Sequence, residues 1–96
     1  MLISNTAMSR AFFAARLRQR FAVQEQAGLA LELCEVEQLT ASLPGHEAFS
    51  LLFHGPRPIL PQATYTLSTD DSGPLPIFLV PLSCVGEVVQ YQAVFN

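Results

Sequence analysis

Few side chains in this sequence could perform acid–base or nucleophilic chemistry. There are two histidines, and we place His46 in a loop and His54 in a strand. Ser50, His54 and Asp70 supply the residue types of a hydrolase triad, but the Gly-x-Ser-x-Gly turn that exposes such a serine is absent. Because nothing else in the chain supports a triad, we expect no catalytic residue and predict that the protein is not an enzyme.

The residue types that hold metals and cofactors are equally sparse. The two cysteines, Cys34 and Cys84, lack the Cys-x-x-Cys spacing of a metal site. Without a secretory signal we expect both thiols to be reduced and largely buried, and a catalytic pairing of Cys34 with His54 has no further support. Residues 70–73 lack the ligand pattern of a calcium loop, so we interpret them as a hairpin turn. We therefore predict no metal and no cofactor.

Charge is divided unevenly along the chain. The net charge is −3, lysine is absent, four of the five arginines lie between positions 10 and 20, and all eight acidic residues follow position 24. This balance argues against nucleic-acid binding, which needs a positive surface that displaces counterions from phosphates. Arg10, Arg16 and Arg20 form a candidate partner-binding face that would meet an acidic surface. The alternative is a face that is merely solvated.

The loop at residues 55–61 is the most distinctive segment of the chain. Three of its residues are prolines, which fix φ and donate no backbone hydrogen bond, so the loop should be stiff. A stiff loop loses little conformational entropy on binding, which makes Arg57 and Ile59 candidate partner-binding residues. The alternative is that the loop simply crosses one end of the fold.

The elements that would position these residues begin with a helix. Residues 8–20 contain neither glycine nor proline, and Phe13, Leu17 and Phe21 recur at a spacing of four. This spacing predicts an amphipathic helix over 8–20 that buries an apolar stripe and leaves its arginines largely off that stripe.

From residue 21 onward the hydrophobic period changes to two, which is typical of strands. The pattern predicts about six strands at hairpin spacing without a β–α–β unit, and so a mainly β fold. We expect a small antiparallel β-barrel or curled sheet with one N-terminal α-helix. A slip in the alternation predicts a β-bulge near Cys34–Glu35 that returns Val36 to the core. Residues 75–82 are apolar in both phases, which predicts a strand covered on both faces.

Length and composition fit one domain. Of the 96 residues, 50% are hydrophobic and only 14% are charged, which excludes a disordered chain. We predict a single domain over 1–96, with a flexible N-terminus at 1–7, a helix at 8–20 and a barrel at 21–96. No secretory signal or membrane-length apolar run is evident, so we expect a cytoplasmic protein that binds no membrane. Export inside a larger assembly is the alternative.

Four segments and the helix before them resemble a family of small bacterial proteins that is a domain of unknown function. The segments are Phe49-Ser50-Leu51-Leu52-Phe53-His54-Gly55-Pro56, Leu60-Pro61-Gln62-Ala63-Thr64-Tyr65, Phe78-Leu79-Val80-Pro81 and Tyr91-Gln92-Ala93-Val94-Phe95-Asn96. The resemblance covers about positions 8–96 and implies no activity and no catalytic residues. It does imply occurrence near phage-tail-collar-like proteins. The chain departs from the family pattern at Arg18–Gln19, where a glycine is expected, and this departure predicts a slightly longer helix.

Together these observations predict a non-enzymatic interaction module, an adaptor or accessory subunit of a larger bacterial assembly. The family resemblance alone implies that this assembly is phage-tail-like. The absence of a catalytic set, the small apolar-rich body and the segregated charge favour a protein partner. The alternative is a carrier that holds a small apolar ligand in the barrel mouth. Two oligomeric states stay open, a monomer and a homo-oligomer formed through a strand edge or the helix.

Overall fold

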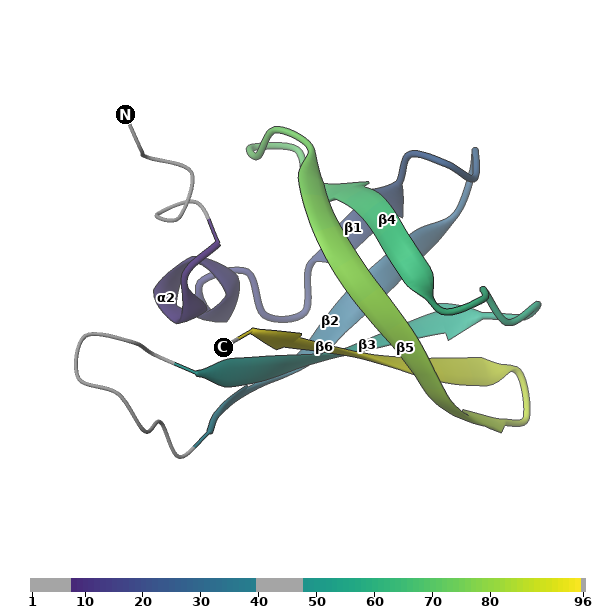
Figure 1. Cartoon of the computed structure of the whole chain (residues 1–96). Coiled ribbons are helices and arrows are strands. Elements are labelled where there is room, and N and C mark those ends of the chain that lie inside the picture. Colours follow the sequence, from purple (N-terminus) through teal and green to yellow (C-terminus); the bar gives the residue numbers. More distant parts are fainter. Residues whose placement is uncertain (1–7, 40–47, 96) are drawn as a thin grey trace.

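The computed structural model describes residues 8–39 and 48–95, which form one short helix and six strands (Figure 1). In chain order the elements are α2 (Arg10–Ala14), β1 (Arg20–Val23), β2 (Ala30–Gln38), β3 (Phe49–Pro56), β4 (Ala63–Ser68), β5 (Leu75–Val85) and β6 (Val88–Phe95). The segment predicted to be flexible, 1–7, and the loop that contains His46 lie outside the described residues.

The six strands form a closed antiparallel barrel in the order β1-β2-β3-β6-β5-β4. Neighbours in the chain pair as β1–β2, β2–β3, β4–β5 and β5–β6, whereas β3 pairs with β6 across the chain. Two residue pairs between β1 and β4 close the barrel. The predicted fold class, a mainly β antiparallel barrel with one N-terminal helix, is confirmed.

Alternating apolar residues of the strands fill the barrel interior. Every strand contributes a fully buried side chain, and these include Phe21, Leu31, Leu33, Phe53, Leu67, Leu79 and Tyr91. Burying one such side chain stabilises the fold by roughly 1.5–3 kcal/mol. The period-two pattern therefore decides which face of each strand points inward.

The predicted bulge on β2 is present. The register between β2 and β3 shifts between Leu33 and Glu35, so Cys34 is the extra residue. After the shift Val36 pairs with Leu51 and packs against the core as a partly buried side chain. The extra residue restores the inward phase, as the slip in the sequence pattern indicated.

The helix is shorter than the predicted range of 8–20. α2 spans Arg10–Ala14, and Ser9 caps it because its hydroxyl accepts a hydrogen bond from the backbone N–H of Phe12 at 3.1 Å. Turns carry the chain from the helix to residue 18, and Leu17, predicted to lie on the apolar stripe, is 43% exposed. Within the described residues no helix is long and apolar enough to cross a membrane.

Arg18 lies in the turns after the helix, where the chain is directed toward β1. Its φ is 73°, in the left-handed region that glycine favours, and its N–H donates to the carbonyl oxygen of Leu33 at 2.7 Å. The prediction that a missing glycine at Arg18–Gln19 lengthens the helix is therefore wrong. An arginine adopts the glycine-like conformation and directs the chain into β1.

Side chains close both ends of the barrel. At one end Phe13 of α2 is fully buried and packs against aromatic rings from β1, β3 and β6 at centroid distances of 5.6 to 6.2 Å. At the other end the loop between β3 and β4 folds Leu60 into the core, and the N–H of Leu60 donates to the Tyr91 hydroxyl at 2.8 Å. Figure 1 shows α2 and this loop on opposite sides of the barrel.

The prediction that residues 75–82 form a strand covered on both faces is wrong. Along β5, Ile77 and Leu79 point into the core, whereas the alternate residues Phe78 and Leu82 are each 50% exposed. Hydrophobic periodicity reports residue types but not the neighbours that cover them. The second apolar phase of this strand therefore forms a surface.

Candidate interaction surface

The hairpin of β5 and β6 carries most of the exposed apolar side chains. Seven large hydrophobic side chains of the described residues are exposed, and five of them lie on this hairpin. We call these five the hairpin surface: Phe78, Leu82, Val85, Val88 and Val94. Their exposed fractions run from 43% for Val88 to 74% for Val85, and Glu87 is the one charged residue between positions 75 and 95. The hairpin surface is therefore apolar and almost uncharged.

Strand register joins the hairpin surface to β3. Val80 lies opposite Gln92, and Gln92 lies opposite Leu52 on its other side. Phe78 is two residues from Val80 and Val94 is two residues from Gln92, so each pair shares a face of its strand. This apolar part of the outer face therefore spans three strands with Gln92 at its middle. Ser83, Gln90 and His54, which pair across the same strands, separate it from Val85 and Val88.

The loop that was predicted to dock a partner lies at the end of this hairpin. The Nε of Arg57 donates to the carbonyl oxygen of Gly86 in the β5–β6 turn at 2.9 Å. Ile59 is 49% exposed, whereas the next residue, Leu60, is buried. The loop thus closes the barrel end and is tied to the hairpin turn. The role of Arg57 and Ile59 in partner binding stays a prediction.

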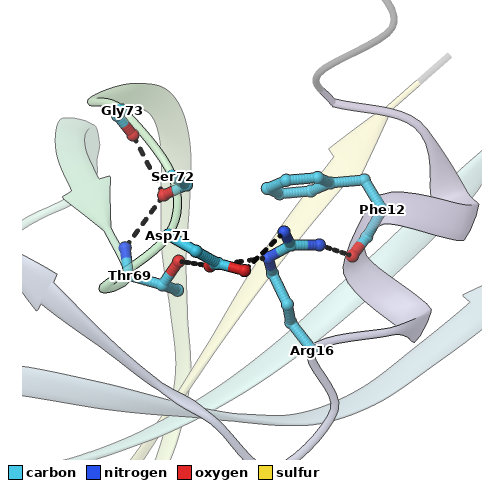
Figure 2. A network of polar contacts seen from close by, with 6 residues as sticks. All are labelled: Phe12, Arg16, Thr69, Asp71, Ser72 and Gly73. Atoms are coloured by element: carbon cyan, nitrogen blue, oxygen red, sulfur yellow. Dashed lines mark hydrogen bonds and ion pairs between the residues drawn. The ribbon is translucent and has the colours of Figure 1, made fainter.

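Arg16 is held within the protein rather than presented to solvent. Figure 2 shows its guanidinium between the Phe12 ring and the β4–β5 turn. Its Nη2 lies 3.0 Å from Oδ2 of Asp71, and its Cζ lies 3.8 Å from the centroid of the Phe12 ring. The Arg16 side chain is only 17% exposed. This contact joins the turns after α2 to the barrel.

The other two predicted arginines stand on different elements. Arg10 is the first residue of α2 and is partly buried. Arg20 is exposed on β1, opposite Glu32, rather than on the predicted helix. The predicted face of three arginines therefore draws on a helix, a turn and a strand, and its binding role stays a prediction.

Two carboxylates tie turns to neighbouring elements. Hydrogen bonds from the Thr69 hydroxyl and then from Arg16 hold the pKa of Asp71 below its ordinary value. The Glu25 carboxylate accepts the backbone N–H of Thr66 at 2.9 Å and the Thr66 hydroxyl at 2.8 Å. These hydrogen bonds, the backbone one first, lower the pKa of Glu25. In their charged form both carboxylates therefore accept hydrogen bonds that hold the turns in place.

The residues that could form a hydrolase triad are not assembled. Ser50 and His54 are four residues apart on β3, which separates them by about 13 Å along an extended strand. Ser50 is 7% exposed. His54 instead contacts Gln90, with 3.1 Å between the two Nε2 atoms, and the Ser83 hydroxyl donates to Oε1 of Gln90 at 3.0 Å. His54 thus belongs to a polar row across the strands.

This polar row borders a shallow groove of about 420 Å³. Arg20, Glu32, His54 and Glu87 bring ionisable groups to the groove, and the β1–β2 turn, the end of β3 and Val88 of β6 line the rest. Pairing of Arg20 with Glu32 and of Glu32 with His54 places three of these residues in one line. The groove therefore combines charges of both signs and has no single preference for anions or cations.

Both cysteines are free, and they are half-buried rather than largely buried as predicted. The Cys34 thiol donates to the carbonyl oxygen of Glu32 at 3.5 Å. Burial and then the negative charge of Glu32 raise the pKa of the Cys34 thiol. A raised pKa disfavours the thiolate, which is the reactive form of cysteine.

The hairpin surface is the feature that sequence reasoning missed. Apolar residues in both phases of 75–82 were assigned to a doubly covered strand. A second signal, one charged residue in the stretch 75–95, was present in the sequence. Charge depletion over a whole hairpin is typical of the centre of an interface and would have identified the surface.

Comparison with known proteins identifies a family. No curated protein and no solved structure shows significant similarity to the chain. A family model described as "Domain of unknown function (DUF6916)" matches residues 8–95, which is nearly the whole chain. The predicted membership of a domain-of-unknown-function family is confirmed, and the chain belongs to the family described as DUF6916.

Proposed function

We propose that this protein is a non-enzymatic interaction module, an adaptor or accessory subunit that binds another protein of a larger bacterial assembly. The observation that carries the proposal is the hairpin surface, with five exposed large apolar side chains and one charge over 75–95. Clusters of exposed large apolar side chains mark interaction sites in proteins. A phage-tail-like identity for the assembly is proposed from the family resemblance alone.

The filled interior of the closed barrel favours binding on an outer surface rather than in an internal cavity. Phe13 fills one end of the barrel and Leu60 the other, while Tyr91 and Phe53 occupy the interior. The alternative carrier would need space for an apolar ligand where these side chains pack. The outer face of the hairpin needs no rearrangement before it meets a partner, which favours binding.

Charged substitutions on the hairpin surface test this proposal. The full chain with an affinity tag is captured from its own cells after cross-linking, as wild type and as Leu82→Asp and Val94→Asp. The matched control is Leu17→Asp, since Leu17 is 43% exposed but lies away from the hairpin. Circular dichroism establishes that each variant is folded.

We expect one protein to be recovered equally with the wild type and with Leu17→Asp. Recovery should fall about tenfold or more for the hairpin variants, because a buried charge at an interface centre is costly. Equal recovery with all variants, or no partner with the wild type, would overturn the proposal.

A further inference from the structure

The groove beside the polar row has the size of a small-molecule site. Its volume is about 420 Å³, and ligand pockets in proteins typically measure about 300–1,000 Å³. The groove lies where Ala30 of β2 and Gly55 of β3 carry no large side chain. Leu29 of the β1–β2 turn and Val88 of β6 add apolar atoms to its lining. Apolar walls with a few polar groups are typical of sites that bind small molecules.

One positive and one negative side chain reach this groove from different strands. Arg20 comes from β1 and Glu87 from the turn before β6, and both are exposed. Glu32 also lines the groove, but its Oε2 lies 3.7 Å from Nη1 of Arg18, which balances its charge. Within the described part of the chain neither Arg20 nor Glu87 takes part in an ion pair. The groove therefore offers a cation and an anion to a ligand.

The strand order sets the separation of these two charges. β2 and β3 lie between β1 and β6 in the barrel. Neighbouring strands are about 4.8 Å apart, so the backbones of β1 and β6 are separated by up to about 14 Å. The side chains of Arg20 and Glu87 shorten this gap, because both line the groove. An extended peptide spans roughly 3.3–3.6 Å per residue, so two or three residues fit what remains. A single α-amino acid, which carries both charges on one carbon, is too short to meet both side chains.

Hydrogen bonds fix the polar side chain at the middle of the groove. Nε2 of His54 lies 3.1 Å from Nε2 of Gln90, and the Ser83 hydroxyl donates to Oε1 of the same glutamine at 3.0 Å. His54 itself is paired with Glu32 and Gln90 in the sheet register. Because the imidazole is already held, a ligand would order few side chains when it binds.

We infer that this groove binds a short zwitterionic peptide of two or three residues with an apolar side chain. The peptide carboxylate meets the guanidinium of Arg20, whose planar fork matches a carboxylate. The peptide amino group meets the carboxylate of Glu87, and the apolar side chain contacts Leu29 or Val88. The inference goes beyond the proposed function, because Leu82 and Val94, which test that function, do not line the groove.

A titration of the full-length protein with the tripeptide Ala-Leu-Ala tests the inference. The tripeptide is used with free termini, with an acetylated amino group, with an amidated carboxyl group, and with both ends blocked. We expect amide NMR shifts from the free tripeptide at the residues that line the groove. Each singly blocked form should bind about tenfold more weakly, since it loses one charge-assisted contact. The doubly blocked form, which resembles an internal segment of a protein chain, should bind more weakly still.

Two variants assign the ends of the peptide. Arg20→Gln should weaken binding of the free tripeptide about tenfold but leave the amidated form unaffected, because that form has no carboxylate. Glu87→Gln should likewise weaken the free tripeptide but leave the acetylated form unaffected. A merely structural role of either residue would weaken all forms alike. Arg10→Gln and Glu37→Gln remove the same charges outside the groove and should bind as the wild type does.

The outcomes separate this inference from the proposed function. No shift with the free tripeptide, equal binding of the doubly blocked form, or equal weakening of all forms by Arg20→Gln and Glu87→Gln would overturn the inference. Leu82→Asp and Val94→Asp should bind the tripeptide as the wild type does, even where they no longer recover a protein partner. Loss of tripeptide binding in these two variants would contradict a separate site.

Discussion

The guanidinium of Arg16 and the carboxylate of Asp71, 55 residues apart in the chain, form an ion pair with 3.0 Å between Nη2 and Oδ2. The same guanidinium lies over the Phe12 ring and donates from Nη1 to the Phe12 carbonyl oxygen at 2.9 Å (Figure 2). A helix of five residues has little stability of its own. The contacts of Arg16 and the burial of Phe13 therefore hold α2 on the barrel.

Substituting Arg16 should loosen the helix. Arg16→Ala removes the stacking on Phe12 and the contact with the β4–β5 turn, and we expect the free energy of unfolding to fall by about 1 kcal/mol. Arg16→Lys keeps the charge but not the planar fork, so it should recover only part of the loss. Urea unfolding measures both, with Arg20→Ala on β1 as the exposed control. An Arg16→Ala protein as stable as Arg20→Ala would show that the ion pair does not hold α2.

Acid should weaken the fold through Asp71 and Glu25. The pKa of each carboxylate is lower in the folded state than in the unfolded state. Each charged group therefore stabilises the fold at a pH above its unfolded-state pKa, and this stabilisation is lost as the pH falls through its folded-state pKa. The loss therefore begins as pH drops below the ordinary values of 4.5 for Glu25 and 3.8 for Asp71. Thermal unfolding is measured between pH 6 and about pH 2 for the wild type and for the double variant Asp71→Asn, Glu25→Gln. The melting temperature of the double variant should fall less steeply with decreasing pH than that of the wild type. The same dependence of the melting temperature on pH in both proteins would mean that these carboxylates do not drive acid unfolding.

Phe13 should be the costliest single truncation in the helix region. Its side chain is fully buried among aromatic rings of three strands, so Phe13→Ala leaves a cavity and should lower stability by about 3–5 kcal/mol. Leu17→Ala, at a residue 43% exposed, should cost less than about 1 kcal/mol. Chemical denaturation of the two variants compares them directly. Similar small losses would mean that α2 does not close the barrel end.

Arg18 should be a site where glycine stabilises the protein. Arg18 has a φ of 73°, which is strained for a residue with a Cβ atom, whereas glycine adopts it without strain. Glycine loses more entropy on folding, which offsets part of the gain from relieved strain. We therefore expect Arg18→Gly to raise stability by no more than about 1 kcal/mol. Arg18→Val should lower it, because a branched side chain is least tolerated there. Greater stability of the valine variant would contradict the assigned backbone conformation.

The sequence predicted those features that local patterning determines. Alternation identified the strands, and a slip in that alternation at Cys34–Glu35 identified the bulge. It could not show that Arg18 would adopt a left-handed conformation, because residue type there favours a helix. It also could not pair Arg16 with Asp71, since that contact depends on how the closed barrel brings distant turns together.

The candidate surface was harder to predict than the fold. The stiffness of the loop predicts a partner-binding role for Arg57 and Ile59, which stays a prediction, and the structure ties that loop to the β5–β6 turn through Gly86. Phe78 and Leu82 were assigned to a covered strand because periodicity alone does not distinguish a covered apolar face from an exposed one. Only the assembled barrel shows which of the two phases faces outward.

Site-specific photo-cross-linking tests the central claim, that the hairpin surface binds another protein, most directly. A photoreactive phenylalanine analogue is placed in the full chain at position 82 or 94 on the hairpin surface, and at exposed position 17 as the control. Illumination in the protein's own cells should yield one covalent adduct with the same protein from both hairpin positions and none from position 17. No adduct from the hairpin, or the same adducts from all three positions, would contradict the claim.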